Sequence, residues 1–141
     1  MPGPLDGIRI LDLSAVISGP YGTMILADQG ADVIKVEPPG RGDFTRSAGN
    51  KSGGMSASFL NNNRNKRSIT LDLKSPAGLN IVKRLAAISD VVVQNFRPGV
   101  VERLGVGEED LRKIKPDLIY VSISGFGEEG PFCDRPVYDP I

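Results

Sequence analysis

Histidine is absent from all 141 residues of the sequence. Its absence removes the imidazole on which Ser-His-Asp and Cys-His nucleophile activation depend, and it also removes His-ligated zinc sites. Unless another segment or chain supplies that group, any chemistry here must use carboxylates, hydroxyls, lysine or backbone groups. We therefore expect a site that holds no metal ion.

Cysteine is nearly absent too, and the one present, Cys133, cannot form an internal disulfide. The opening residues, MPGPLDGIRIL, lack the basic flank and long apolar core of a secretory signal. Apolar runs also fall well short of the ~18 residues that span a bilayer. These absences lead us to expect a cytoplasmic protein with no membrane segment.

The chain also has no net charge, because 17 basic residues balance 17 acidic ones. A chain without a net field has no general attraction for nucleic acid or for an anionic membrane. Any anionic ligand must therefore be held by a local group of cations. The apolar content of 40% and charged content of 24% are ordinary for one globular domain with a packed core.

Short apolar runs alternate with helical patterns along the chain. Expected strands cover residues 8–13, 32–37, 67–73, 90–96 and 118–124, and expected helices cover 21–29, 55–62, 76–86, 99–104 and 108–114. This alternation is typical of an α/β fold: an open parallel sheet with helices on both faces. Residues 38–54 are rich in glycine and have few apolar anchors, so we expect a surface loop.

The expected strands leave the sheet incomplete. Residue 141 follows the last strand closely, and Asp139-Pro140 is typical of a turn into further structure. We expect residues 1–141 to form the amino-terminal part of a domain that continues beyond Ile141.

The first strand, helix and second strand favour an anion site at the start of the helix. However, the turn SAVISGPYG lacks a GxGxxG pattern, and Pro20 removes one backbone donor. Glu37 ends the second strand, where some dinucleotide-binding proteins place a ribose-binding acid, but a Glu before Pro-Pro is more often solvated. The dinucleotide interpretation is therefore a minor alternative.

Cations and polar groups flank the later strands. Arg64, Lys66 and Arg67 form either a solvated cluster or a counter-charge for phosphate. The carboxyl ends of the strands carry Lys74, the run from Asn95 to Gly99 with Arg103, and Ser122 to Gly127. Since the carboxyl ends of parallel strands share one edge of the sheet, this pattern favours a phosphorylated organic ligand.

Five pieces of the sequence occur in an order and spacing that resemble one family: PLDGIRILDLS, SGPYGTMILADQGADVIKVEPPG, NRNKRSITLDLK, DVVVQNFRPGVVERLG and LIYVSISGFGEEGP. The sequence is similar to the amino-terminal region of the class III coenzyme A (CoA) transferases. This is the carnitine dehydratase and bile-acid-inducible group, which also contains α-methylacyl-CoA racemase.

The resemblance implies a Rossmann-like large domain, a smaller second domain and an interlocked homodimer. It implies that the substrates are an acyl-CoA and a carboxylic acid. Matching family positions assign CoA contacts to six residues: Val16, Leu71, Lys74, Asn95, Phe96 and Arg103. Lys74 and Arg103 suit the phosphates, whereas Val16, Leu71 and Phe96 offer apolar contact to the adenine or the pantetheine arm.

Two positions depart from the family pattern. Pro38 stands where some members have a phosphate-binding arginine, so that contact is missing or moved to Arg41. Racemases have a histidine where this chain has Tyr138, directly before Asp139. In the transferases an aspartate nucleophile follows this motif, which places it beyond residue 141, and we expect no catalytic residue within the chain.

Three functions stay open. The leading hypothesis is a CoA-transferase that forms an aspartyl anhydride and then an enzyme thioester. The second is a racemase or CoA-dependent lyase on the same fold. The third is a non-catalytic module that binds CoA or a nucleotide.

Overall fold

A parallel sheet of five strands organises the computed structural model, which describes residues 3–137. The strands are β1 (Arg9–Asp12), β2 (Asp32–Glu37), β5 (Lys66–Thr70), β6 (Val91–Gln94) and β7 (Ile119–Ser122). They lie in the order β5-β2-β1-β6-β7, and every neighbouring pair is parallel. Leu11 in the central strand aligns with Ile34 on one side and Val92 on the other.

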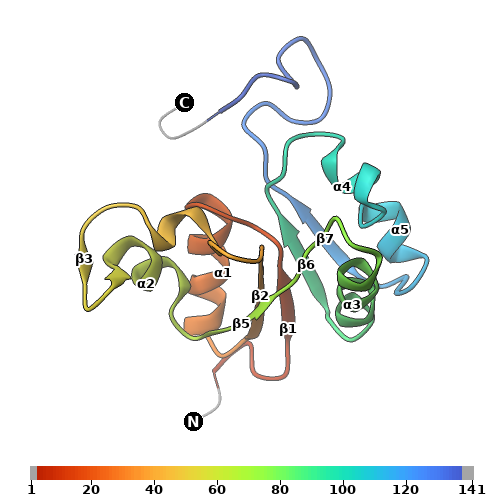
Figure 1. Cartoon of the computed structure of the whole chain (residues 1–141). Coiled ribbons are helices and arrows are strands. Elements are labelled where there is room, and N and C mark those ends of the chain that lie inside the picture. Colours follow the sequence, from red (N-terminus) through yellow and green to blue (C-terminus); the bar gives the residue numbers. More distant parts are fainter. Residues whose placement is uncertain (1–2, 138–141) are drawn as a thin grey trace.

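Helices cover both faces of this sheet, as the alternating pattern predicted (Figure 1). One side carries α1 (Ser18–Asp28) and α2 (Ala57–Asn63), and the other carries α3 (Pro76–Ala87), α4 (Val100–Leu104) and α5 (Glu108–Arg112). The expected α/β fold with an open parallel sheet is therefore confirmed.

Two apolar cores follow from the alternation of side chains along each strand. Ile10, Val33 and Val93 pack with Ala27 of α1. A larger cluster fills the other face, between the sheet and α3, α4 and α5, and contains Leu11, Leu13, Ile34, Val36, Leu71, Val82, Ala86, Val92, Val101, Val106, Leu111 and Leu118. Burial on both faces explains why the inner strands β1, β2 and β6 are rich in β-branched and leucine residues, whereas the edge strands β5 and β7 are more exposed.

The start of α3 shows how local sequence sets an element boundary. The Ser75 hydroxyl accepts a hydrogen bond from the Gly78 N–H at 3.1 Å, and Pro76 takes the first helical position. Proline fits there because the helix has no use for its missing N–H. This cap was predictable from the sequence.

The segment 38–54 is more ordered than predicted. It contains a 3-10 turn, η1 (Phe44–Arg46), and the short strand β3 (Lys51–Ser52), which pairs antiparallel with β4 (Met55–Ser56). Asp43 and Thr45 are 2% and 3% exposed, so polar side chains rather than apolar ones anchor this segment. Apolar periodicity could not reveal such an anchor.

Four strands end earlier than predicted, namely β1 at Asp12, β5 at Thr70, β6 at Gln94 and β7 at Ser122. β5 ends at Thr70 because Asp72 starts a turn, in which its carboxylate accepts the Lys74 N–H at 2.9 Å. β6 ends at Gln94 because the Asn95 side chain bonds to another loop. Within residues 3–137 no helix is long and apolar enough to cross a membrane.

Candidate functional site

The order of the strands creates a topological switch point between β1 and β6. From β1 the chain moves outward through β2 to β5, and it then returns to place β6 on the other side of β1. The connections after β1 and β6 therefore run to opposite faces of the sheet and leave a crevice at the carboxyl ends of these strands. This is the usual place for a ligand in an open α/β sheet.

A hollow of about 360 Å³ lies at this position. Its walls come from the segment after β1, the segment after β6 and the segment after β7, which loops above the sheet in Figure 1. Lining residues are Leu13, Ala15, Val16, Ile17, Ser18, Asn95, Phe96, Arg97, Pro98, Ile123, Ser124, Gly125, Phe126, Cys133, Arg135, Pro136 and Val137. The lining is mostly apolar with two guanidinium groups, a composition suited to an organic anion.

Glycine at position 125 lets the last of these segments fold back on itself. A Cβ at Gly125 would lie 2.5 Å from Val137 Cγ2, so no larger residue fits without movement. The hollow thus depends on a close approach between the beginning and the end of the segment after β7.

Three of the six predicted CoA-binding residues line the hollow: Val16, Asn95 and Phe96. The Asn95 side chain, however, is engaged with the loop between β1 and α1. Its amide Nδ2 donates to the Ala15 carbonyl oxygen at 2.8 Å, and its Oδ1 accepts the Ala15 N–H at 2.9 Å. The structure therefore gives the Asn95 amide a role in shaping this wall.

The other three predicted residues lie outside the hollow. Leu71 is 8% exposed and belongs to the large core cluster, against which Phe96 also packs. Lys74 and Arg103 are exposed, and neither forms an ion pair with any residue between 3 and 137. Both follow the carboxyl ends of strands, so they stand at the same edge of the sheet as the hollow.

The basic cluster 64–67 does not supply free counter-charges for phosphate, and that interpretation is wrong. Arg64 pairs with Asp28 at 2.6 Å, and Arg67 pairs with Asp32 at 2.6 Å. Lys66 Nζ is buried and lies 3.0 Å from Asp12 Oδ2. The carboxylates that pair with these cations lie far away in the sequence, so the sequence alone does not reveal the ion pairs.

Glu37 is not a ribose-binding acid. Burial raises its pKa, but hydrogen bonds from Arg46, the Ser68 hydroxyl and the Asp43 N–H outweigh burial and lower that pKa to about 2. The Arg46 guanidinium contacts both carboxylate oxygens, at 2.6 and 2.7 Å. Arg41 is exposed on the same loop and forms no ion pair within the described chain.

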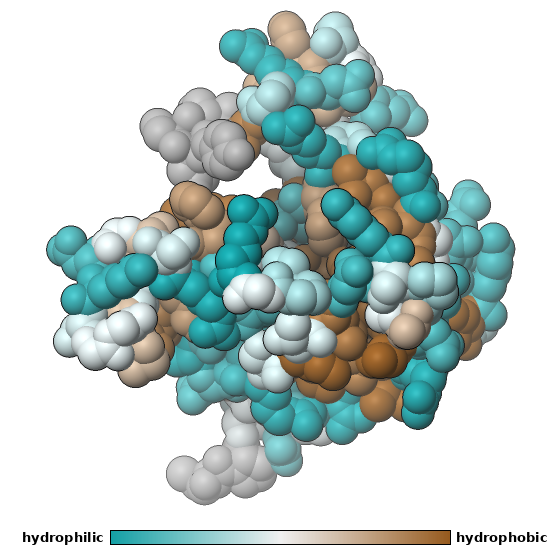
Figure 2. Space-filling view, in the orientation of Figure 1, coloured by the Kyte–Doolittle hydropathy of each residue, from teal (hydrophilic) through white to brown (hydrophobic). Residues whose placement is uncertain are grey.

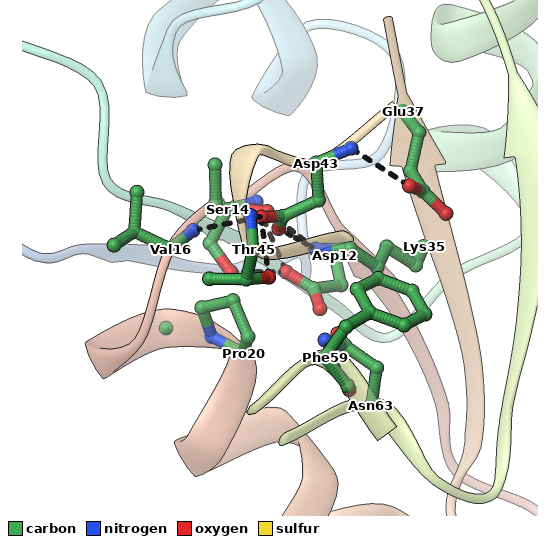
Figure 3. Close-up of polar contacts among 12 residues, drawn as sticks. Asp12, Ser14, Val16, Pro20, Lys35, Glu37, Asp43, Thr45, Phe59 and Asn63 are labelled. Carbon is green, nitrogen blue, oxygen red and sulfur yellow. Dashed lines mark hydrogen bonds and ion pairs between the residues drawn. The ribbon is translucent and has the colours of Figure 1, made fainter. Parts of the chain in front are cut away.

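Beneath the wall formed by residues 15–17 lies a buried polar network, which Figure 3 shows in part. Three carboxylates and three cations form its ion pairs: Asp12 with Lys66, Asp43 with Lys35, and Glu37 with Arg46. The charges cancel within the network, as burial requires. Sequence reasoning missed Lys35 and Asp43, and the only signal was a lysine inside the apolar run DVIKVE.

The final motif of the chain lies outside the described residues, so Tyr138 and Asp139 stay predictions. Within residues 3–137 no group of three or more His, Cys, Asp or Glu side chains is placed to hold a metal ion.

Known proteins resemble this chain over almost its full length. The model of CoA-transferase family III matches residues 5–141. A succinyl-CoA:glutarate CoA-transferase from Mus musculus is 52% identical over 98% of the chain and 32% of that protein. An acetyl-CoA:oxalate CoA-transferase from Acetobacter aceti is 50% identical over 99% of the chain and 36% of that protein. The chain thus spans about a third of the length of these relatives.

Solved structures agree with the sequence comparison. The crystal structure of a CAIB/BAIF family protein from Brucella suis superposes with a TM-score of 0.93, at 44% identity over 99% of this chain and 38% of that one. Rv3272 from M. tuberculosis superposes with a TM-score of 0.91, at 43% identity over 98% of this chain and 39% of that one. The chain belongs to CoA-transferase family III.

Proposed function

We propose that this chain is the CoA-binding part of a CoA-transferase that moves CoA between an acyl-CoA and a carboxylic acid. The observation that carries the proposal is the hollow at the switch point between β1 and β6, in a chain whose family match covers residues 5–141. Relatives at about half identity are named for transfer to glutarate and to oxalate, which supports a carboxylic acid as the acceptor.

In this proposal CoA lies across the carboxyl edge of the sheet. Val16 and Phe96 offer apolar surface inside the hollow, which suits the pantetheine arm. Lys74 and Arg103 have no carboxylate partner among the described residues, so their charges are available to phosphates. Leu71 and Asn95 complete the site, Leu71 from the adjoining core and Asn95 by shaping the loop between β1 and α1.

The chemistry requires that CoA stay bound between two exchanges. An aspartate carboxylate beyond residue 141 attacks the thioester carbonyl, which forms a mixed anhydride and releases CoA as the thiolate. The thiolate then attacks the aspartyl carbonyl, which frees the donor acid and gives an enzyme thioester for the acceptor acid. A site that binds the nucleotide end of CoA keeps the thiolate near the anhydride. We assign this binding to residues 3–137.

We further propose that the complete protein is a cytoplasmic, interlocked homodimer. Large apolar side chains on α1, α2 and the edge strand β7 support a partner surface, since Tyr21 is 49% exposed, Leu60 45% and Ile119 59%. Figure 2 shows further hydrophobic surface over the α3 and α4 side of the molecule. These exposed side chains are candidates for contact with the rest of the complete protein or with a partner subunit.

Calorimetric titration of the complete protein with CoA tests the site. Lys74→Ala and Arg103→Ala should each weaken CoA binding by roughly 1 to 3 kcal/mol, the scale of a hydrogen bond to a charged group. Lys51→Ala and Arg84→Ala are matched controls, because both residues are exposed cations without an ion pair in the described chain. Unchanged affinity in both test variants would remove the phosphate-site assignment.

Proton exchange separates transfer from racemisation. The complete protein is incubated with a 2-methylacyl-CoA in deuterated water, and NMR follows the proton on the α-carbon. A transferase leaves that proton in place and passes CoA to an added acid. Rapid exchange without any transfer would establish a racemase instead.

A further inference from the structure

Lys35 is a buried lysine in the middle of the sheet, and its side chain is 1% exposed. It belongs to β2, whose other neighbours in the apolar run pack into the two cores. A buried ammonium is costly unless it is paired and fully hydrogen-bonded. A methionine or leucine would fill the same space without that cost, so the charge calls for an explanation.

The Lys35 ammonium bonds directly to the loop between β1 and α1. Its Nζ donates to the Ser14 carbonyl oxygen at 2.8 Å. The same Nζ lies 2.9 Å from Asp43 Oδ2, and Asp43 Oδ1 accepts the Val16 N–H at 3.4 Å. Figure 3 shows Ser14, Val16 and Asp43 gathered around this point. Lys35 therefore acts on residues 14 and 16, directly and through Asp43.

Residue 15 of this loop is held from the other side, because both polar atoms of the Asn95 side chain bond to the Ala15 backbone. Three successive residues are thus held by side chains from β2, from the loop before η1 and from the segment after β6. These bonds fix a loop, a class of segment that is usually among the more mobile parts of a fold.

The supported loop carries backbone strain. Val16 has a φ of 71°, in the left-handed region. This conformation is unfavourable for a β-branched residue, and strain of this kind persists only where the surroundings enforce it. Because Ala15, Val16 and Ile17 form one wall of the hollow, the strained conformation sets the shape of that wall.

We infer that Lys35 is a positioning residue for the CoA site: through Ser14 and Asp43 it holds Val16 in the strained conformation that shapes the hollow. The inference rests on the proposed function, because it takes CoA as the ligand. Lys35 lies beneath the wall and does not touch the hollow, so its effect on CoA is transmitted through the loop.

The double variant Lys35→Met/Asp43→Asn tests this role in the complete protein. It removes both buried charges together, so neither is left unpaired. The introduced amide keeps an oxygen that can accept the Val16 and Thr45 N–H groups, and the principal loss is the bond from Lys35 to Ser14. The KM for acyl-CoA should rise about tenfold, the scale of one lost hydrogen bond to a charged group, while kcat at saturating acyl-CoA changes little.

Comparing KM with kcat separates positioning from stability. A purely structural role would lower the fraction of folded enzyme, which lowers the apparent kcat and leaves KM unchanged. Leu118→Ala is the matched control, because Leu118 is 1% exposed and precedes β7, at the amino-terminal end of the strand, whereas the hollow lies at the carboxyl ends of the strands. This control should lose stability without a change in KM.

Hydrogen exchange supplies a readout that does not depend on activity. Amides in residues 14–16 should exchange faster in the double variant than in the wild type, and the Leu118→Ala control should show no such local change. Unaltered exchange there would overturn the inference, because the loop would then keep its conformation without Lys35.

Titration of the wild type with CoA is done first and separates the two proposals. If the wild type does not bind CoA, the proposed function and this inference fall together. If it binds CoA and the double variant keeps the wild-type KM, the positioning role falls and the proposed function stands. An equal rise of KM in Leu118→Ala would also overturn the role, because any loss of stability would then produce it.

Discussion

Glu37 allows a quantitative test of the buried network. Its pKa is lowered from 4.5 to about 2, because hydrogen bonds from Arg46, Ser68 and the Asp43 backbone outweigh the raising effect of burial. At ~1.4 kcal/mol for each pH unit, this difference corresponds to roughly 3 kcal/mol of stability at neutral pH. The Glu37 side chain is 2% exposed but that of Arg46 is 42% exposed, so solvent partly screens this pair and the figure is an upper value.

The sign of the pH dependence follows from the direction of the pKa change. A carboxyl group whose pKa is lower in the folded state stabilises the protein above its ordinary pKa, and this stability is lost as the pH falls toward the folded pKa. The contribution of Glu37 should therefore be complete at neutral pH and decline between about pH 5 and about pH 2.

The perturbation is Glu37→Gln, which keeps the shape of the side chain and removes its charge. Near pH 7 the variant should unfold more easily than the wild type by up to roughly 3 kcal/mol, and the difference should shrink as the pH falls. Equilibrium urea unfolding at a series of pH values measures it. Glu129→Gln is the control, because Glu129 is exposed and forms no ion pair within residues 3–137.

The test is how the difference in the free energy of unfolding between the wild type and Glu37→Gln changes with pH. A difference that stays constant with pH, or that grows on acidification, would refute the argument, because either result would mean that ionised Glu37 does not stabilise the fold. Loss of the same size in Glu129→Gln would show that the effect is not specific to the buried pair with Arg46.

Three further outcomes follow from other parts of the structure. Ser75→Ala should cost about 1 kcal/mol in urea unfolding, because it removes the side-chain cap of α3, and Ser75→Asp should recover most of the loss. Lys66→Met should lower the free energy of unfolding by about 3 to 5 kcal/mol, because it leaves Asp12 buried without a cation. Lys66→Met/Asp12→Asn should lower it less, and an equal loss in both variants would contradict the charge argument. Burial raises the pKa of Tyr120, whose hydroxyl donates a hydrogen bond to a carbonyl oxygen at 3.1 Å. In an ultraviolet titration up to about pH 11, Tyr120→Phe and the wild type should therefore show the same absorbance change. A smaller change in the variant would contradict this expectation.

The pattern of elements was contained in the sequence. β2 covers the predicted residues 32–37, and α3 begins at the predicted residue 76, because both depend on contacts between near neighbours in the chain. The apolar strands also predicted the parallel sheet with helices on both faces, since only burial on both sides allows such continuous apolar runs. The family was also predictable from the sequence, because its motifs occur along the chain in the family's order and spacing.

The tertiary structure alone decided which polar groups are free to bind a ligand. Arg64, Lys66 and Arg67 resembled a phosphate site, yet each takes a carboxylate that lies 35 to 54 positions away in the sequence. The sequence pattern predicts Lys35 only as one residue of a strand, and its partner Asp43 lies in the glycine-rich segment for which the pattern predicts a loop. Charge pairing depends on distances in space, and these were fixed only when the order β5-β2-β1-β6-β7 brought remote segments together.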